Sequence, residues 1–163
     1  MVKSVKSIFV VLVFGSFISY SFNEEREVNE KPFLGDKAPE LVFKHEKQML
    51  NLHANDGKYT LLSFWAAYDA NSRVRNAELS RITDNNAHVK MISVSFDRYR
   101  SVYDAAMRQD GLRADDCHWE KEGEKSDLFR AYGLKNGFKN YLLDSNGVIV
   151  AANVTADELS AYL

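Results

Sequence analysis

The sequence predicts an α/β fold in which a central mixed β-sheet is flanked by helices. Two nearly continuous apolar runs, 59–65 and 89–96, have strand length and are apolar on both faces, as is typical of strands inside a sheet. A segment with helical spacing, 69–81, separates them, and such a strand–helix–strand unit joins its strands in parallel. Short apolar runs on both sides of the turn at 144–147 predict an antiparallel hairpin, so the sheet is expected to be mixed.

Composition restricts the class of protein further. The chain has 163 residues, 45% of them hydrophobic and 27% charged, which describes one globular domain with a core. Its 21 Lys and Arg against 23 Asp and Glu leave no excess of base, so we expect no nucleic-acid partner. The single cysteine, Cys117, excludes an intramolecular disulfide, a Cys-x-x-Cys pair and any multi-thiolate metal site. We therefore expect no metal and no cofactor.

The first segment, 1–21, is predicted to be a signal peptide. Two lysines precede an apolar run that starts at Ile8, and small residues at positions 19 and 21 suit cleavage before Phe22. An uncleaved anchor is the alternative, although the run of about 15 residues is shorter than the roughly 20 that span a bilayer. We expect an exported protein of the periplasm or cell envelope, with membrane contact only through this segment if it stays uncleaved.

A polar linker, 22–34, is predicted between the signal segment and a domain at 35–163. The linker is almost wholly polar from Asn23 to Lys31 and has too little apolar surface to form a core. Pro32 and Pro39 bracket the start of the domain, which we expect to be extended because residues before proline avoid the helical region.

The remaining elements follow in chain order. A short strand at 41–43 is expected to pair with 49–52, and 55–57 marks a turn before the first central strand. The spacing of apolar residues predicts a helix over 101–110, and Gly111 follows where a left-handed residue would end it.

The last third of the chain is expected to complete the sheet and its cover. A minor strand is expected at 117–119 and a short helix at 126–132, before the hairpin strands 141–143 and 148–151. Thr155 and Glu158 form a capping box that opens the last helix, which carries Leu159, Tyr162 and Leu163.

Five segments, in this order along the chain, resemble thioredoxin-like proteins. They are Gly35–Pro39, Leu62–Tyr68, Val94–Asp97, Tyr132–Leu134 and Tyr141–Asp144. Together they resemble the exported thiol-disulfide oxidoreductases of the TlpA/ResA type, which are related to the AhpC/TSA proteins. The resemblance covers 35–163 and implies a thioredoxin-like fold.

The chain departs from this family at the redox motif. The family pattern is W-x-x-W/Y-C-x-x-C-R, and the corresponding residues are Trp65-Ala66-Ala67-Tyr68-Asp69-Ala70-Asn71-Ser72-Arg73. Asp69 stands at the nucleophilic cysteine and Ser72 at the resolving cysteine. Neither side chain can form the mixed disulfide on which thiol–disulfide exchange depends. The reactive cysteine of the peroxiredoxin relatives is also absent from this region.

A second departure concerns the loop that holds substrate peptides in the family. Phe138 stands where the family has a cis-proline. A cis bond before Phe would cost about 2.5–4 kcal/mol, so we expect the Gly137–Phe138 bond to be trans and the loop to be rebuilt.

These departures predict a redox-inactive thioredoxin-fold protein, a pseudoenzyme that acts as a binding or assembly module for an unknown envelope protein or peptide. Asp69 is open to two interpretations. It could only cap a helix, accepting from the amide of Asn71 or Ser72, or it could be a fixed anion on a partner-binding surface. The degenerate positions that would form this surface are Trp65, Tyr68, Asp69, Ala70, Asn71, Ser72, Arg73 and Phe138. Trp65 could equally be a packing residue.

Cys117 supports an alternative function, a thiol oxidoreductase that uses this lone thiol with an external reductant. Asp115, Asp116, Cys117 and His118 gather metal-ligand types, but neighbouring residues of an extended segment point to opposite faces and do not share an ion easily. A buried, apolar role for Cys117 is the competing interpretation.

Overall fold

A computed structural model describes residues 31–44, 48–50, 52, 59–84 and 86–162 of the chain. The predicted signal segment, most of the predicted linker and the predicted turn at 55–57 lie outside the described residues. Among the helices of the described part, none has the length and apolar character needed to cross a membrane.

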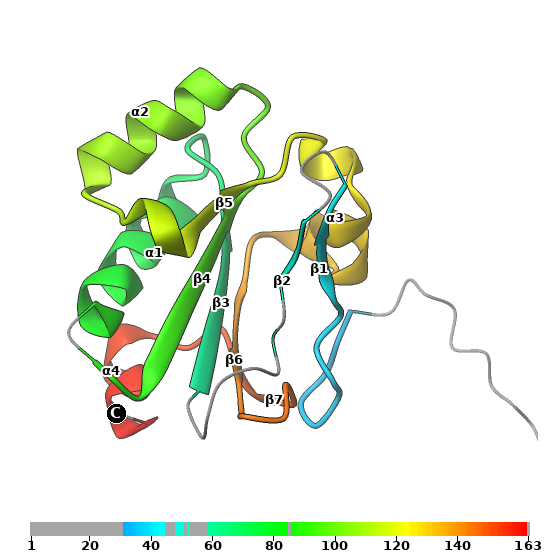
Figure 1. Ribbon diagram of the computed structural model, residues 1–163, viewed down its shortest axis with the longest axis vertical. Helices are drawn as coiled ribbons and strands as arrows, with labels where there is room; N and C mark the ends of the chain where they lie inside the picture. Colours follow the sequence, from blue (N-terminus) through cyan, green and yellow to red (C-terminus); the bar gives the residue numbers. More distant parts are fainter. Residues whose placement is uncertain (1–30, 45–47, 51, 53–58, 85, 163) are drawn as a thin grey trace, which may run out of the picture.

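The core of the fold is a five-stranded mixed sheet with the order β5-β4-β3-β6-β7 (Figure 1). Its strands are β3 (Tyr59–Trp65), β4 (Val89–Ser95), β5 (Cys117–Trp119), β6 (Asn140–Leu143) and β7 (Ile149–Ala152). β3 runs parallel to β4 and antiparallel to β6, and β6 pairs with β7 as the predicted hairpin. The predicted mixed sheet is thus confirmed, with the most apolar strand, β3, at its centre.

Alternate residues of β3 pack against different layers, as the two-residue period of a strand requires. Leu62 and Phe64 belong to a cluster on the face covered by α3 (Asp127–Ala131) and by a hairpin of β1 (Leu41–Phe43) and β2 (Gln48–Leu50). Leu61 packs on the opposite face with residues of α1 (Ala70–Thr83) and α4 (Ala156–Leu159). Trp65 packs on that same face with residues of α2 (Arg100–Asp110).

Helix boundaries follow the predicted signals with one difference. Gly111 ends α2 in the left-handed conformation at φ 66°, and Thr155 and Glu158 form the predicted capping box. The last helix is shorter than predicted, because α4 ends at Leu159 and a 3-10 turn (Ser160–Tyr162) continues the chain. Two further 3-10 turns, η2 (Gly123–Lys125) and η3 (Leu134–Asn136), flank α3.

The bond before Phe138 is trans, as predicted. No cis peptide bond occurs among the described residues. Gly137 has a φ of 110°, which only glycine adopts readily, and it lies directly before Phe138. The loop that leads into β6 is therefore built on a glycine rather than on a cis-proline.

Candidate functional site

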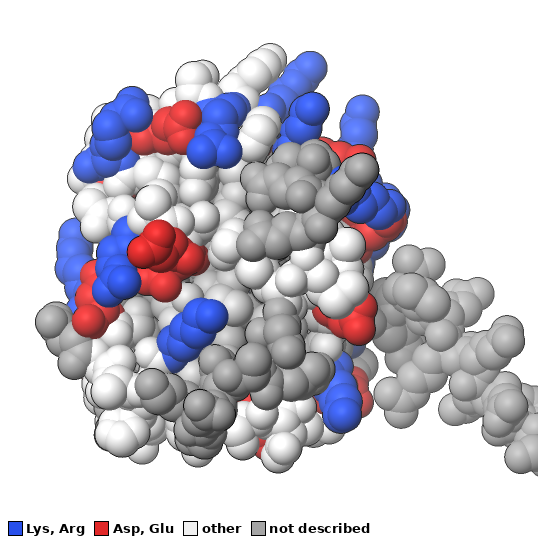
Figure 2. All heavy atoms as spheres, viewed as in Figure 1, with Lys and Arg blue, Asp and Glu red and all other residues white. Residues whose placement is uncertain are grey.

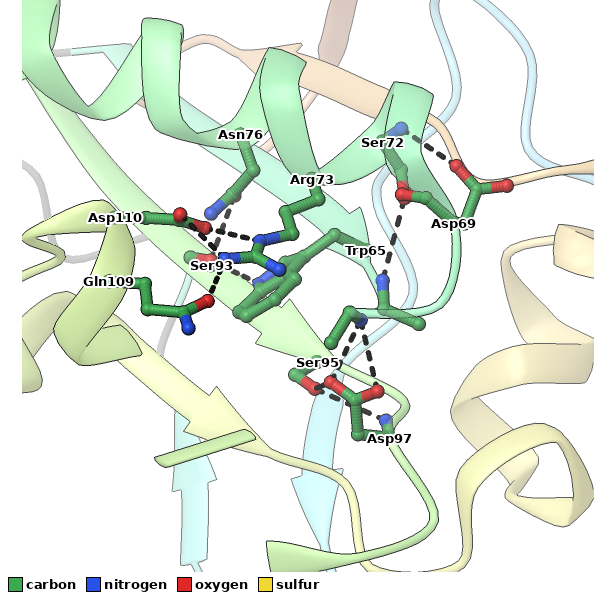
Figure 3. A network of polar contacts seen from close by, with 12 residues as sticks. Trp65, Asp69, Ser72, Arg73, Asn76, Ser93, Ser95, Asp97, Gln109 and Asp110 are labelled. Atoms are coloured by element: carbon green, nitrogen blue, oxygen red, sulfur yellow. Dashed lines mark hydrogen bonds and ion pairs between the residues drawn. The ribbon is translucent and has the colours of Figure 1, made fainter. Parts of the chain in front are cut away.

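The candidate site lies where β3 and β4 end at the same edge of the sheet, at the N-terminus of α1 (Figures 1 and 3). Parallel neighbours place their carboxyl ends side by side, so the loop after β3 meets the loop after β4. The first loop carries Tyr68 and Asp69, and the second carries Asp97. The predicted positions 66–73 lie in the first loop and the start of α1, Trp65 is the last residue of β3, and Phe138 and Cys117 come from other parts of the chain.

Trp65 is a packing residue. Its side chain is fully buried, and its Nε1 donates a hydrogen bond to Ser93 Oγ at 2.8 Å. The Ser93 hydroxyl in turn donates to Asn76 Oδ1 at 2.9 Å, which links the tryptophan to the middle of α1 (Figure 3). One interpretation of Asp69 placed Trp65 on an exposed partner-binding surface. Because Trp65 is buried, it is not part of such a surface.

A buried carboxylate fixes the loop between β3 and α1. Both carboxylate oxygens of Asp97 accept from the backbone N–H of Ala67, at 2.9 and 3.0 Å, and one of them also accepts from Ser95 Oγ at 2.8 Å. Asp97 is only 2% exposed, so these contacts supply hydrogen bonds that the buried charge would otherwise lack. These hydrogen bonds join the loop after β3 to the end of β4 (Figure 3).

Asp69 and Ser72 are bonded to each other at the first turn of α1. Asp69 Oδ1 accepts from the backbone N–H of Ser72 at 2.7 Å, which confirms the predicted N-cap. The Ser72 hydroxyl donates to the Asp69 carbonyl oxygen at 3.1 Å, and its side chain is buried. The two positions that correspond to the cysteines of the family motif thus hold an N-cap carboxylate and a hydroxyl that donates to the N-cap carbonyl.

Arg73 ties α1 to α2 instead of lying free on the surface. Its Nε and Nη2 donate to the two carboxylate oxygens of Asp110 at 2.7 and 2.8 Å, and Nη2 also donates to Gln109 (Figure 3). The hydrogen bond to Asp110 raises the pKa of Arg73 above its usual range. Such a two-point arginine–carboxylate contact has a fixed geometry, so Arg73 acts as a structural link.

The exposed part of the site consists of Tyr68, Ala70 and Asn71. Tyr68 is 63% exposed, and its hydroxyl donates to Glu124 Oε1 of η2 at 2.7 Å. Partial burial, followed by the hydrogen bond to Glu124, raises the pKa of Tyr68. Tyr68 therefore stays protonated at neutral pH and bridges the loop after β3 to η2.

Phe138 fills the place of the cis-proline with an aromatic ring. The ring stacks on Phe96 with a centroid distance of 5.9 Å, and Phe129 and Tyr68 lie at 6.2 and 6.1 Å. The carbonyl oxygen of Phe138 accepts from Arg75 Nη2 at 2.8 Å. The rebuilt loop is thus held by an aromatic cluster of four rings, Tyr68, Phe96, Phe129 and Phe138, and by α1.

Comparison with known proteins agrees with this geometry. No family model matches the chain, and no curated protein matches it. A solved thioredoxin-like protein from Parabacteroides distasonis is 38% identical, with a TM-score of 0.75 over 82% of this chain and 96% of that one. The chain belongs to the thioredoxin-like family of thiol-disulfide oxidoreductases.

Two oxidoreductases from Bacteroides share the fold of this thioredoxin-like protein. A thiol-disulfide oxidoreductase from Bacteroides fragilis is 26% identical, with a TM-score of 0.63 over 77% of this chain and 96% of that one. The thioredoxin domain of a thiol-disulfide oxidoreductase from Bacteroides vulgatus is 22% identical, with a TM-score of 0.67 over 80% and 95% of the two chains. The predicted fold and family are both confirmed.

Cys117 of this thioredoxin-like protein is buried, as the competing interpretation predicted. It is 8% exposed in β5 and packs with Trp65, Tyr103 and Ala106. Burial raises the pKa of Cys117 to about 11. Reactive cysteines have lowered pKa values and accessible sulfur atoms, and Cys117 has neither. In the described part of the chain, no three His, Cys, Asp or Glu side chains come together as a metal site.

Sequence reasoning missed several residues that shape this site. They are Arg75, Phe96, Asp97, Glu124 and Phe129. Asp97 was open to prediction, because an acidic residue directly after a buried parallel strand lies at the same sheet edge as the end of the neighbouring strand. The other four depend on contacts between segments that are distant in sequence, and no local pattern signals them.

Proposed function

We propose that this thioredoxin-like protein is a redox-inactive binding module that is exported to the cell envelope, where it binds a partner protein or peptide through the surface around Tyr68, Asp69 and Asn71. Export is supported by the signal-like segment at 1–21. The family consists of oxidoreductases. The proposal therefore depends on whether this chain has lost the groups that carry out thiol–disulfide exchange.

The contact between Asp69 and Ser72 supports the loss of redox chemistry most directly. In an oxidoreductase of this kind, the helix N-terminus stabilises a thiolate. Here the carboxylate of Asp69 occupies the place of that thiolate and accepts a hydrogen bond from the Ser72 N–H at 2.7 Å. A carboxylate and a hydroxyl contain no sulfur, so no electrons can pass through these two positions.

The geometry of the surrounding surface supports a binding function. The loop after β3 is fixed by the contact between Asp97 and Ala67, so Tyr68 is displayed on a rigid support. Rigid display of an exposed aromatic residue lowers the conformational entropy that binding costs. Large aromatic side chains of this kind are common at the centres of protein interfaces.

The lone thiol gives little support to the alternative, an oxidoreductase that uses Cys117. An enzyme of that kind needs an accessible thiolate, whereas burial raises the pKa of Cys117 to about 11. The thiol also lies in β5, and not in the loop after β3 where the family motif falls.

Site-specific cross-linking in cells tests the binding function. A photo-reactive amino acid is placed at position 71, which is exposed beside Asp69, in the full chain. The matched control carries it at position 157, which is exposed on α4. We expect a discrete cross-linked product at position 71 that is absent at 157 and that Asp69→Ala weakens. The same products at both positions, or none at 71, would contradict the proposal.

A further inference from the structure

Two hollows lie beside the candidate site and meet at Glu124. The first, of about 400 Å³, extends from Tyr68 and Phe96 to η2. The second, of about 570 Å³, lies along Phe129 and the segment of η3, and Glu124 lines both. We call these two hollows, which share Glu124 as a lining residue, the α3 hollows.

Positive charge is concentrated around the α3 hollows. Six cationic residues line them against two acidic residues, although the whole chain has a formal charge of −2. The cationic residues are Lys31, Arg98, Lys121, Lys125, Arg130 and Lys135, and the acidic ones are Glu122 and Glu124. Figure 2 shows Lys and Arg side chains projecting at the upper right of the molecule, around α3 and the segment before it.

Half of these cationic residues form no ion pair within the described part of the chain. Arg130 pairs with Asp127, but no ion pair among the described residues involves Lys121, Lys125 or Lys135. All three lysines are exposed. The carboxylate of Glu124 accepts from the Tyr68 hydroxyl at 2.7 Å, which directs one of the two acidic groups toward the tyrosine. A ligand that reaches the hollows therefore meets more cationic than acidic lining residues.

The floor of the hollows is apolar where the rim is charged. Phe129 lines the second hollow and is partly buried, and its ring contacts Phe96, which is only 2% exposed beside the first hollow, edge to face at 5.5 Å. An aromatic floor under a cationic rim suits a segment that combines carboxylates with an apolar side chain. A basic or a purely polar segment would match only part of this surface.

We propose that the α3 hollows bind an acidic segment of a partner polypeptide, with its carboxylates against Lys121, Lys125 and Lys135 and an apolar side chain against Phe129. The inference rests on the proposed binding function and adds the chemistry of the partner. Attraction of this kind acts mainly on association and weakens as salt screens the charges.

Fluorescence anisotropy with a short labelled peptide tests this inference. The probe has one central Phe between Asp and Glu residues, and its control has every acid replaced by Asn or Gln. We expect the full-length protein to bind the acidic probe at least about tenfold more tightly than the amide control. Raising the salt from about 50 to about 300 mM should weaken binding to the acidic probe by a similar factor, because the added salt shortens the range of the attraction.

Two charge-reversing variants, one within the hollows and one outside them, locate the binding. The double variant Lys121→Glu, Lys125→Glu should weaken binding to the acidic probe about tenfold or more, because like charges then face each other. Lys90→Glu is the control, since Lys90 is exposed at the start of β4, at the end opposite to Phe96. It should leave the affinity unchanged. Equal losses in both variants would overturn the inference, because they would indicate attraction to the overall charge.

The remaining outcomes separate this inference from the function on which it rests. Equal affinity for the acidic and amide peptides would overturn the acidic-segment inference. So would binding only to vesicles that contain anionic lipid, or only between copies of this chain in sedimentation velocity. If position 71 nevertheless gives its discrete cross-link, the binding function stands and only the partner chemistry is wrong. If the cross-link is absent while the acidic peptide binds as expected, the proposal that partners bind around Asp69 is wrong, and the inference that the α3 hollows bind acidic segments is supported.

Discussion

The Oδ1 atom of Asp69 accepts a hydrogen bond from the backbone N–H of Ser72 at 2.7 Å. The two residues that the sequence comparison with the family motif sets at its cysteine positions are therefore bonded to each other, across the first turn of α1. A reduced Cys-x-x-Cys motif uses the same amides to stabilise its thiolate. The substitution keeps a negative group at the helix N-terminus and removes the sulfur chemistry.

Replacing Asp69 should reveal its value as a cap. Asp69→Ala removes the acceptor for the Ser72 N–H, so we expect the free energy of unfolding to fall by about 1 kcal/mol in urea denaturation. Asp69→Asn keeps an acceptor oxygen and should lose less than half of that amount. Equal losses in the two variants would show that the charge, and not the hydrogen bond, stabilises the turn.

Restoring the cysteines should restore the disulfide. In the double variant Asp69→Cys, Ser72→Cys, the two Cα atoms would lie about 5–6 Å apart across the first turn, within the range that a disulfide requires. Thiol titration under denaturing conditions should find one free thiol after mild oxidation and three after reduction. Asp69→Cys alone is the control and should form no intramolecular bridge. A double variant that oxidises only between molecules would contradict the assignment of these positions.

Phe138 should contribute to stability through its ring. Phe138→Ala removes the ring from contact with Phe96 and Phe129, and we expect a loss of about 2–3 kcal/mol because the side chain is partly buried. Phe33→Ala is the matched control, since Phe33 is 51% exposed and lies outside the aromatic cluster. The control should change stability by less than about 0.5 kcal/mol. Similar losses in both variants would contradict the role given to the cluster.

The reactivity of Cys117 should depend steeply on pH. Burial raises its pKa to about 11, so alkylation of the native protein by iodoacetamide should be very slow at neutral pH and should accelerate up to that value. The proton is held more tightly in the folded state. Its contribution to stability is therefore complete below the pKa of an unfolded cysteine, about 8.5, and is lost as the pH rises toward about 11. Fast alkylation at pH 7 in native protein would contradict the buried position.

The elements of the fold were predictable because each one has a local cause. The apolar run of β3, the glycine that ends α2 and the capping box before α4 are all visible in a few neighbouring residues. The Asp69 cap was predictable for the same reason, since N-caps depend on residues within one turn.

The surroundings of the site were not predictable in the same way. Trp65 is conspicuous in the sequence beside the redox motif, but it is buried against residues of α2 and β5 that lie far along the chain. The contact of Phe138 with Phe96 joins residues from different loops, and the cationic rim of the α3 hollows gathers side chains from several segments. Only the three-dimensional fold brings these residues together.

Reduction of insulin by dithiothreitol tests the central claim, that this thioredoxin-like protein has lost thiol–disulfide exchange. The purified full chain and its Cys117→Ala variant are compared with reductant alone. We predict that insulin precipitates at the rate of reductant alone in both cases, because Asp69 and Ser72 hold no sulfur and Cys117 is buried. Faster precipitation that disappears in Cys117→Ala would support the lone-thiol enzyme. Faster precipitation that survives in Cys117→Ala would contradict the account entirely.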